Sequence, residues 1–284
     1  MKKEKQMENY KIVADSSADI MSINDVAFSF APLKIITSEN EYVDNSDLNV
    51  ADMINTLFKY KGKSSTSCPN TEDWLDAFGD GENIFCVPIS KNMSGCYNTA
   101  VIAKELYEEK HPDRKVFVLD TLNAGPGLKL MIEKLCELIK SGRDFDEICT
   151  EITNYQKQVS LVFALESVRN FANNGRINPI IAKTVGLLGI RILSKASEQG
   201  EIQIIDKCRG EERALNHLSK LVFENAKADG KIRISHCLNE PTAIKLRVKI
   251  SEQLPNADIE VYDCRGLCGF YMEKGGILVG YENK

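Results

Sequence analysis

Short apolar runs followed at once by small polar side chains recur in the first half of the chain. Runs within residues 11–15, 83–90 and 115–120 each lead into a segment of helical spacing. Runs of this length bounded by turn residues are typical of buried strands, and strands that alternate with helices predict a parallel sheet covered by helices. Ligands bind beyond the carboxyl ends of such strands. The turns expected at that edge carry Asp15 and Ser16, Ser94 and Gly95, and Asp120, Thr121 and Asn123.

Helical periodicity after these runs predicts which residues face the sheet. The predicted faces comprise Tyr97, Val101, Ile102 and Leu106 after the second run, and Leu128, Met131, Ile132, Leu135 and Leu138 after the third. A further helix, with Trp74, Leu75 and Phe78 as its apolar face, follows the hydroxyl-rich segment 64–67. Asn70 with Asp73 resembles a capping box that begins this helix. Thr66 and Ser67 are therefore available for another role.

The second half of the chain predicts more short strands and a second domain. Strand-like segments lie within 159–167, 231–238, 257–264 and 275–284, with a helix between the second and the third. A chain of 284 residues can form two domains with a substantial core. We place the boundary near residue 158, which gives two α/β domains of residues 1–158 and 159–284.

Charge and hydropathy exclude several classes of protein. The chain has 36 Lys and Arg against 41 Asp and Glu, a formal net charge of −5, so nucleic acid is not an expected partner. The most apolar segment, 177–193, is interrupted by Lys183 and Arg191 and is predicted to be core, so we expect no stable membrane insertion. Nothing at the N-terminus resembles an export signal, and nine cysteines, an odd number, then indicate a reducing cytoplasm.

Metal and cofactor motifs are not apparent. Cys264 and Cys268 form a CxxxC without a second nearby pair, and the three histidines are scattered, so we expect no metal site. The sequence has no Walker motif, and the GPG at 125–127 is not a dinucleotide fingerprint. We therefore expect no cofactor.

Ser94 is the most informative of the hydroxyl side chains, because a helix is expected to begin beside it. It is either an ordinary N-cap or part of an anion site, since the first-turn N–H groups and the helix dipole favour negative charge. A nucleophilic serine is disfavoured, because NMSGC does not match the GxSxG elbow. Hydroxyls and backbone N–H groups without acid–base partners favour binding over catalysis.

Five segments, in order, resemble the successive motifs of the DegV family. They are IVADSSADI at 12–20, TSCPNTEDWLDAF at 66–78, ISKNMSGCYNTA at 89–100, VLDTLNAGPGL at 118–128 and NNGRI at 173–177. The resemblance implies a two-domain α/β fold with an N-terminal, Rossmann-like parallel-sheet domain, a second α/β domain and a ligand tunnel between them. Fatty-acid-binding, FakB-like members of this family hold a long-chain fatty acid and present it to a fatty acid kinase.

The resemblance also implies roles for particular residues. Thr66, Ser67, Ser94 and Gly95 would hold the carboxylate of a C14–C18 fatty acid, and no residue would be catalytic. The implied neighbours of the head group or pocket are Asp15, Ser16, Cys68, Cys96, Asn123, Ala124, Tyr271 and Met272. The protein would then serve phospholipid metabolism as a cytoplasmic, non-catalytic acyl-binding subunit.

Two departures from the family pattern concern the head group. Tyr271 or Met272 stands roughly where the family has a histidine, and a tyrosine donates a hydrogen bond but does not shuttle protons near neutral pH. Cys68 and Cys96 replace the usual Gln and Thr. These cysteines are either small apolar fillers or an oxidisable gate over the head group.

Three basic residues of the second domain have two alternative roles, and the sequence does not decide between them. Arg176, Arg191 and Arg209 serve either in solvation and domain packing or in docking, with Arg176 and Arg209 the candidates for contact with a kinase. A small-molecule phosphotransferase or a ligand sensor on the same architecture is the alternative function. The phosphotransferase requires a site histidine or a nucleotide loop, and none of the three histidines follows a strand-end turn.

Overall fold

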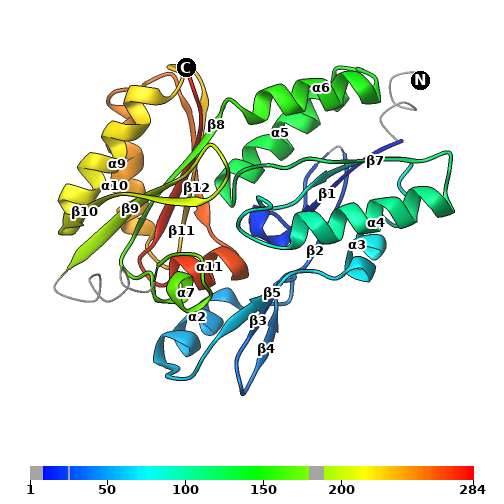
Figure 1. Ribbon diagram of the computed structural model, residues 1–284. Coiled ribbons are helices and arrows are strands. Elements are labelled where there is room, and N and C mark those ends of the chain that lie inside the picture. Colours follow the sequence, from blue (N-terminus) through cyan, green and yellow to red (C-terminus); the bar gives the residue numbers. More distant parts are fainter. Residues whose placement is uncertain (1–8, 25, 179–188) are drawn as a thin grey trace.

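The first domain is built on a parallel sheet, as the sequence predicts. The computed structural model describes residues 9–24, 26–178 and 189–284 (Figure 1). The strands of this sheet are β1 (Tyr10–Asp15), β2 (Ala27–Ala31), β6 (Asn83–Val87) and β7 (Lys115–Val118), in the order β2-β1-β6-β7. Every pairing in it is parallel, so the carboxyl ends of the strands share one edge.

Helices cover both faces of this sheet. They are α3 (Thr71–Phe78) and α4 (Cys96–Lys110) on one face, and α5 (Pro126–Lys140) and α6 (Phe145–Gln156) on the other. Both bonds of the capping box between Asn70 and Asp73 are present at the start of α3. The five apolar residues predicted to face the sheet from α5 are all buried.

The predicted buried face of α4 is wrong. Ile102 and Leu106 are 49% and 46% exposed, whereas Ala100 and Ala103 are fully buried. Small residues contribute little to a hydrophobic pattern, yet they allow the helix to pack closely on its neighbours. Ile102 and Leu106 therefore lie on the outer side of α4.

A small antiparallel sheet, not expected from the sequence, carries the TSCP motif. Its strands are β3 (Lys34–Ile36), β4 (Glu41–Val43) and β5 (Ser65–Ser67), in the order β4-β3-β5, and α2 (Val50–Lys59) follows β4. Thr66 stands opposite Ile35 in the ladder. Most of the hydroxyl-rich segment 64–67 is therefore held as an edge strand.

The second domain is built on a six-stranded mixed sheet. Its strands are β8 (Val159–Leu165), β9 (Ile190–Ala196), β10 (Ile202–Arg209), β11 (Lys231–His236), β12 (Asp258–Asp263) and β13 (Ile277–Glu282), in the order β10-β9-β8-β13-β11-β12. Only β11 and β12 pair in parallel. The strands predicted in the second half of the chain are therefore confirmed, and β8 begins one residue after the predicted boundary.

Helices also cover both faces of the second sheet. One face packs against α9 (Glu211–Asn225) and α10 (Glu240–Ser251); the other faces α2, α7 (Arg169–Asn173) and α11 (Gly266–Met272) (Figure 1). Residues 179–188 of the segment predicted to be core lie outside the described residues. Within the described part, no helix is long and apolar enough to cross a membrane.

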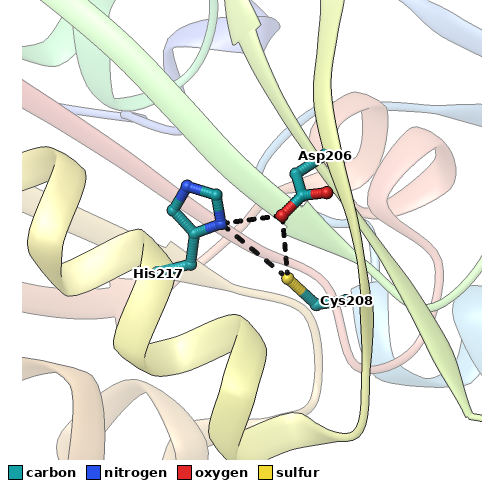
Figure 2. Close-up of side chains that lie close together, drawn as sticks. All are labelled: Asp206, Cys208 and His217. Atoms are coloured by element: carbon teal, nitrogen blue, oxygen red, sulfur yellow. Dashed lines mark hydrogen bonds and ion pairs between the residues drawn. The ribbon is translucent and has the colours of Figure 1, made fainter.

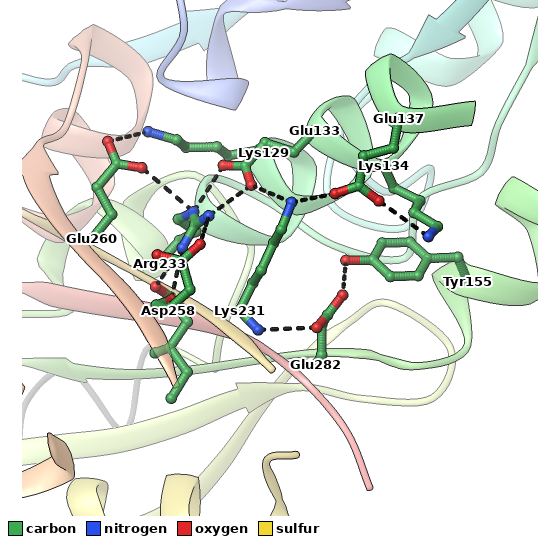
Figure 3. Close-up of polar contacts among 11 residues, drawn as sticks. Lys129, Glu133, Lys134, Glu137, Tyr155, Lys231, Arg233, Asp258, Glu260 and Glu282 are labelled. Atoms are coloured by element: carbon green, nitrogen blue, oxygen red, sulfur yellow. Dashed lines mark hydrogen bonds and ion pairs between the residues drawn. The ribbon is translucent and has the colours of Figure 1, made fainter. Parts of the chain in front are cut away.

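An ionic network joins α5 of the first domain to the second sheet (Figure 3). Arg233 on β11 is only 5% exposed, and its guanidinium donates to both carboxylate oxygens of Glu133, at 2.7 and 2.8 Å. It also donates to a carboxylate oxygen of Asp258 at 2.8 Å. Lys231 binds Glu133 at 3.2 Å and Glu137 at 2.6 Å. Charge-assisted bonds of this kind are stronger than neutral ones, so the network holds the domains in one orientation.

Candidate functional site

Asp15 ties two strand-end loops of the first domain together. Its carboxylate accepts the Ile89 N–H at 2.8 Å and the Ser17 N–H at 3.0 Å. The Ser16 hydroxyl accepts the Leu33 N–H at 3.0 Å. Asp15 and Ser16 are fully buried, and burial raises the pKa of Asp15. Both side chains therefore shape the loops around the site.

The Ser94–Gly95 turn begins α4, but its capping differs from the expectation. The N-cap residue is Gly95, without a side-chain hydrogen bond, and the helix starts at Cys96. Ser94 Oγ accepts the Cys96 N–H at 3.4 Å, a long and weak contact. The hydroxyl is also hydrogen-bonded to the Cys96 sulfur at 3.2 Å, and it lies at the positive end of a 15-residue helix.

The TSCP and NMSG motifs touch each other. A Cβ added to Gly95 would lie 3.2 Å from the sulfur of Cys68, so glycine permits this close approach. Cys96 is fully buried, and burial raises its thiol pKa well above the ordinary value. A buried protonated thiol is unreactive, which favours the apolar-filler interpretation of Cys96.

Tyr271 links the second domain to this site. Its hydroxyl is hydrogen-bonded to the Thr66 hydroxyl at 2.9 Å, and its ring stacks on Phe171 with centroids 4.8 Å apart. Burial raises the pKa of Tyr271, so the phenol remains neutral at physiological pH. The pair places two hydroxyl groups side by side where the two domains meet.

Arg176 lies beside these hydroxyls. Its Nε donates to the Met93 carbonyl at 2.6 Å, and one Nη donates to the Asn174 carbonyl at 2.7 Å. Its positive charge acts to lower the pKa of Tyr271, against the larger effect of burial. Arg176, predicted as a docking residue, therefore brings a cation to the site.

An apolar cavity extends from this point between the domains. Its lining residues are Ile89, Met93, Ala124, Leu161, Phe163, Phe171, Arg176, Ile202, Leu267, Cys268, Tyr271, Met272 and Leu278. The cavity is narrow in this structure, with a volume of about 60 Å³. Apart from Arg176 and the Tyr271 hydroxyl, the lining side chains are apolar. A cavity with apolar walls and polar groups at one end suits an amphipathic ligand.

Comparison with known proteins identifies the family. The profile of the family described as "Uncharacterised protein, DegV family" matches residues 9–284. This chain belongs to the DegV family. A DegV domain-containing protein of Streptococcus gordonii is 39% identical over 277 residues, covering 96% of this chain and 99% of the relative.

Two solved structures with the same fold contain fatty acids. One is a DegV family protein from Eubacterium eligens loaded with heptadecanoic acid (TM-score 0.94, 38% identity, 97% of this chain and 100% of the other). The other is the Streptococcus pneumoniae Fatty Acid Kinase (Fak) B3 protein loaded with linoleic acid (TM-score 0.94, 37% identity, the same coverage). The two-domain architecture expected from the motifs is therefore confirmed for this DegV protein.

Not every predicted site residue lines the cavity of this DegV protein. Asn123 is 2% exposed, and its side chain donates to the Val159 carbonyl at 3.3 Å, so it supports the domain junction. Ser67 donates its hydroxyl to the Cys68 carbonyl at 3.2 Å. Arg209 is exposed at the end of β10 and is not a lining residue. Ala124 and Met272 do line the cavity.

Sequence reasoning missed most of the apolar lining. Leu161 and Phe163 alternate along β8, a spacing that could have identified one face of a strand. Phe171, Ile202 and Leu278 come from separate elements, and nothing in their local sequence shows that they meet.

Buried acids that hold α11, and with it Tyr271, were also missed. Asp44 accepts the Gly266 and Leu267 N–H groups at 2.8 Å each, which satisfies two of the free donors in the first turn of that helix. Asp19 accepts the Arg265 N–H at 2.7 Å, and burial raises its pKa to about 8. These contacts position α11 against the first domain.

Proposed function

We propose that this protein binds one long-chain fatty acid of C14–C18, with its acyl chain in the apolar cavity. The observation that supports this most is the cavity itself, whose apolar walls end at the Thr66–Tyr271 hydroxyl pair and Arg176. Two solved structures that are 38% and 37% identical to this chain are loaded with heptadecanoic and linoleic acid. The chemistry of the cavity and the ligands of the relatives therefore agree.

Affinity comes mainly from the acyl chain, and the polar end selects the head group. About a dozen buried methylenes contribute on the order of 10 kcal/mol before the costs of binding, at roughly 0.8 kcal/mol each. One hydrogen bond to a charged group contributes about 1.5–3 kcal/mol. The carboxylate therefore adds less than the tail but determines which end of the ligand lies at the polar end of the cavity.

Thr66, Ser67, Ser94 and Gly95 form the carboxylate site in this proposal, with Tyr271 as a further donor. The turns that carry them are in contact at Cys68 and Gly95. The Ser94 hydroxyl and the first-turn N–H groups of α4 favour an anion. Tyr271 supplies a neutral donor in place of the family histidine.

The protein acts as a carrier that presents its fatty acid to a fatty acid kinase. A relative that is 37% identical is a Fatty Acid Kinase (Fak) B3 protein, which supports this role. The side chains at the polar end supply hydrogen bonds, and the raised pKa of Tyr271 makes it unsuited to act as a base. All nine cysteines are free, as in proteins of a reducing cytoplasm, where we place it.

Native mass spectrometry of the purified protein, followed by organic extraction, tests the binding proposal. One C14–C18 fatty acid per chain is expected. Ala124→Phe should lose it by filling the cavity, while Ala228→Phe, at an exposed position, should retain it. Circular dichroism of both variants controls for folding. A polar metabolite, or no ligand even after incubation with oleate, would overturn the proposal.

The carrier role has a separate test. The oleate-loaded protein is incubated with ATP and a fatty acid kinase from a bacterium that contains a relative, and the acyl phosphate is measured. Formation of acyl phosphate only when both proteins are present supports presentation. Kinase turnover of free oleate at the same rate without this protein would contradict it, while leaving the binding proposal intact.

A further inference from the structure

Three side chains able to bind a metal converge on the outer side of the second domain (Figure 2). Asp206 and Cys208 come from β10, and His217 comes from α9. Nδ1 of His217 lies 3.0 Å from Oδ2 of Asp206 and 3.9 Å from Sγ of Cys208. Sγ lies 3.7 Å from the same carboxylate oxygen. The three donor atoms form a compact triangle.

A β-bulge places both strand residues on the side of α9. The pairing of β10 with β9 shifts between Ile204 and Asp206, which inserts one extra residue. Before the bulge, Ile204 packs toward the cavity side of the sheet; after it, Cys208 packs in the core beneath α9. A one-residue insertion reverses the facing of every later side chain. The bulge thus aims Asp206 and Cys208 at His217.

The triangle has nearly the size of one face of a tetrahedral zinc site. Zinc bonds of about 2.3 Å to sulfur and about 2.0–2.2 Å to nitrogen or oxygen imply a nitrogen–oxygen separation of about 3.4 Å and sulfur separations of about 3.6 Å. The observed separations are 3.0, 3.7 and 3.9 Å. Shifts of at most about 0.4 Å, within the reach of side-chain rotation, would complete the geometry.

The arrangement differs from a catalytic triad. In a Cys–His–Asp triad the acid and the thiol bind opposite ring nitrogens of the histidine. Here both face Nδ1, the nitrogen at which a cation would sit (Figure 2). Cys208 is fully buried, while the side chains of Asp206 and His217 are 38% and 33% exposed, so an ion can enter from solvent.

We propose that Asp206, Cys208 and His217 bind one zinc ion, with water as the fourth ligand. Sulfur, imidazole and carboxylate together match the preference of zinc among the common divalent ions. On binding, the Cys208 thiol loses its proton to solvent and a zinc–sulfur bond forms. Nδ1 of His217 binds in its unprotonated form. The site does not depend on the fatty-acid function.

The ion would fasten the edge of the second sheet to its covering helix. β10 is an edge strand, and Gly210 alone separates it from α9. The hairpin that β10 forms with β9 reaches the first domain, where the Gly200 carbonyl accepts the Ser90 hydroxyl at 2.8 Å. Zinc would therefore stabilise the strand that carries the cavity residue Ile202.

Zinc and cobalt titrations of the reduced, chelator-stripped full-length protein test the proposal. The wild type should bind one equivalent of zinc and melt at a higher temperature with it. Cobalt should produce a near-ultraviolet sulfur-to-cobalt absorption band. Asp206→Asn and His217→Gln, at half-exposed positions, should weaken zinc binding at least about 100-fold. Mutating even a residue that only hydrogen-bonds to a metal ligand lowers metal affinity about 10–100-fold, and these two are ligands themselves.

Matched substitutions exclude binding elsewhere on a cysteine-rich chain. Cys208→Ser should abolish the cobalt band, whereas Cys149→Ser and His111→Gln should leave both the band and the zinc affinity unchanged. The proposal is overturned if the wild type binds less than one equivalent. It is also overturned if Asp206→Asn and His217→Gln retain the wild-type affinity, or if the band persists in Cys208→Ser.

Discussion

Tyr271→Phe isolates the contribution of one hydroxyl at the polar end of the cavity. The change removes the oxygen that is hydrogen-bonded to Thr66 at 2.9 Å. It preserves the ring, which packs 4.8 Å from Phe171 and 5.0 Å from Phe270 between centroids. The shape of the cavity should therefore be unchanged, and any loss reports on hydrogen bonding.

The size of the effect depends on the charge of the ligand. A hydrogen bond to a carboxylate contributes about 1.5–3 kcal/mol, and one between neutral groups about 0.5–1.5 kcal/mol. Tyr271 gives up its bond to Thr66 when it binds the ligand, so the net loss for a carboxylate is at the lower end of its range, about 1.5 kcal/mol. A loss of about 1.5 kcal/mol weakens oleate binding roughly tenfold. Oleyl alcohol, which lacks the charge, should lose no more than about twofold.

Displacement of a fluorescent fatty acid by oleate and by oleyl alcohol measures both losses. Tyr42→Phe, a half-buried tyrosine on β4 that does not line the cavity, is the matched control and should bind both ligands as the wild type does. Equal losses for oleate and the alcohol would place the carboxylate away from Tyr271. An oleate affinity within twofold of the wild type would show that the Tyr271 hydroxyl does not bind the carboxylate.

Three further predictions concern stability and the carboxylate. Arg233→Met should lower the free energy of unfolding, measured in urea, by about 3 kcal/mol. This is the low end of the loss expected when one partner of a buried ion pair is removed, because Glu133 and Asp258 are partly exposed and can be solvated. Asp19, with a pKa near 8 when folded and about 3.9 when unfolded, should make the protein less stable as pH rises from about 4 to 8. Asp19→Asn should reduce that decline in urea titrations across this range. Ser94→Ala should slow acyl phosphate formation by a kinase more than it weakens oleate binding, because the tail supplies most of the affinity.

Each of these predictions has a contradicting result. Arg233→Met would count against the ionic network if it cost no more than Lys220→Met, which breaks an exposed pair with Glu224. An unchanged pH profile in Asp19→Asn would show that this carboxyl is not the group that titrates. Unaltered kinase turnover in Ser94→Ala would remove Ser94 from the carboxylate site.

Local patterns predicted three of the four strands of the first parallel sheet, because each is a short buried run that ends in turn residues. Buried runs ending in Asp15 and Val87 are neighbouring parallel strands, and the capping box at Asn70 begins α3 as expected. The face of α4 could not be found this way, because Ala100 and Ala103 carry little hydrophobic signal. Close packing of small residues becomes visible only in the folded chain.

The site was predictable only in part, because it forms where distant segments meet. The motifs pointed to Thr66 and Ser94, and the missing family histidine drew attention to Tyr271. The bond between Thr66 and Tyr271 joins residues 205 positions apart, which no local pattern can show. The cluster at Asp206 depends on a bulge that reverses the facing of β10, and ordinary strand alternation does not predict it.

The most direct test of the account is a crystal structure of the protein with a fatty acid that carries bromine at its terminal carbon. Anomalous scattering locates the bromine, and the electron density locates the carboxylate. We expect bromine among Leu161, Phe163 and Leu278, and a carboxylate oxygen within hydrogen-bonding distance of Thr66 or Ser94. Bromine beside Thr66 and Tyr271, or a ligand bound outside the apolar cavity, would contradict it.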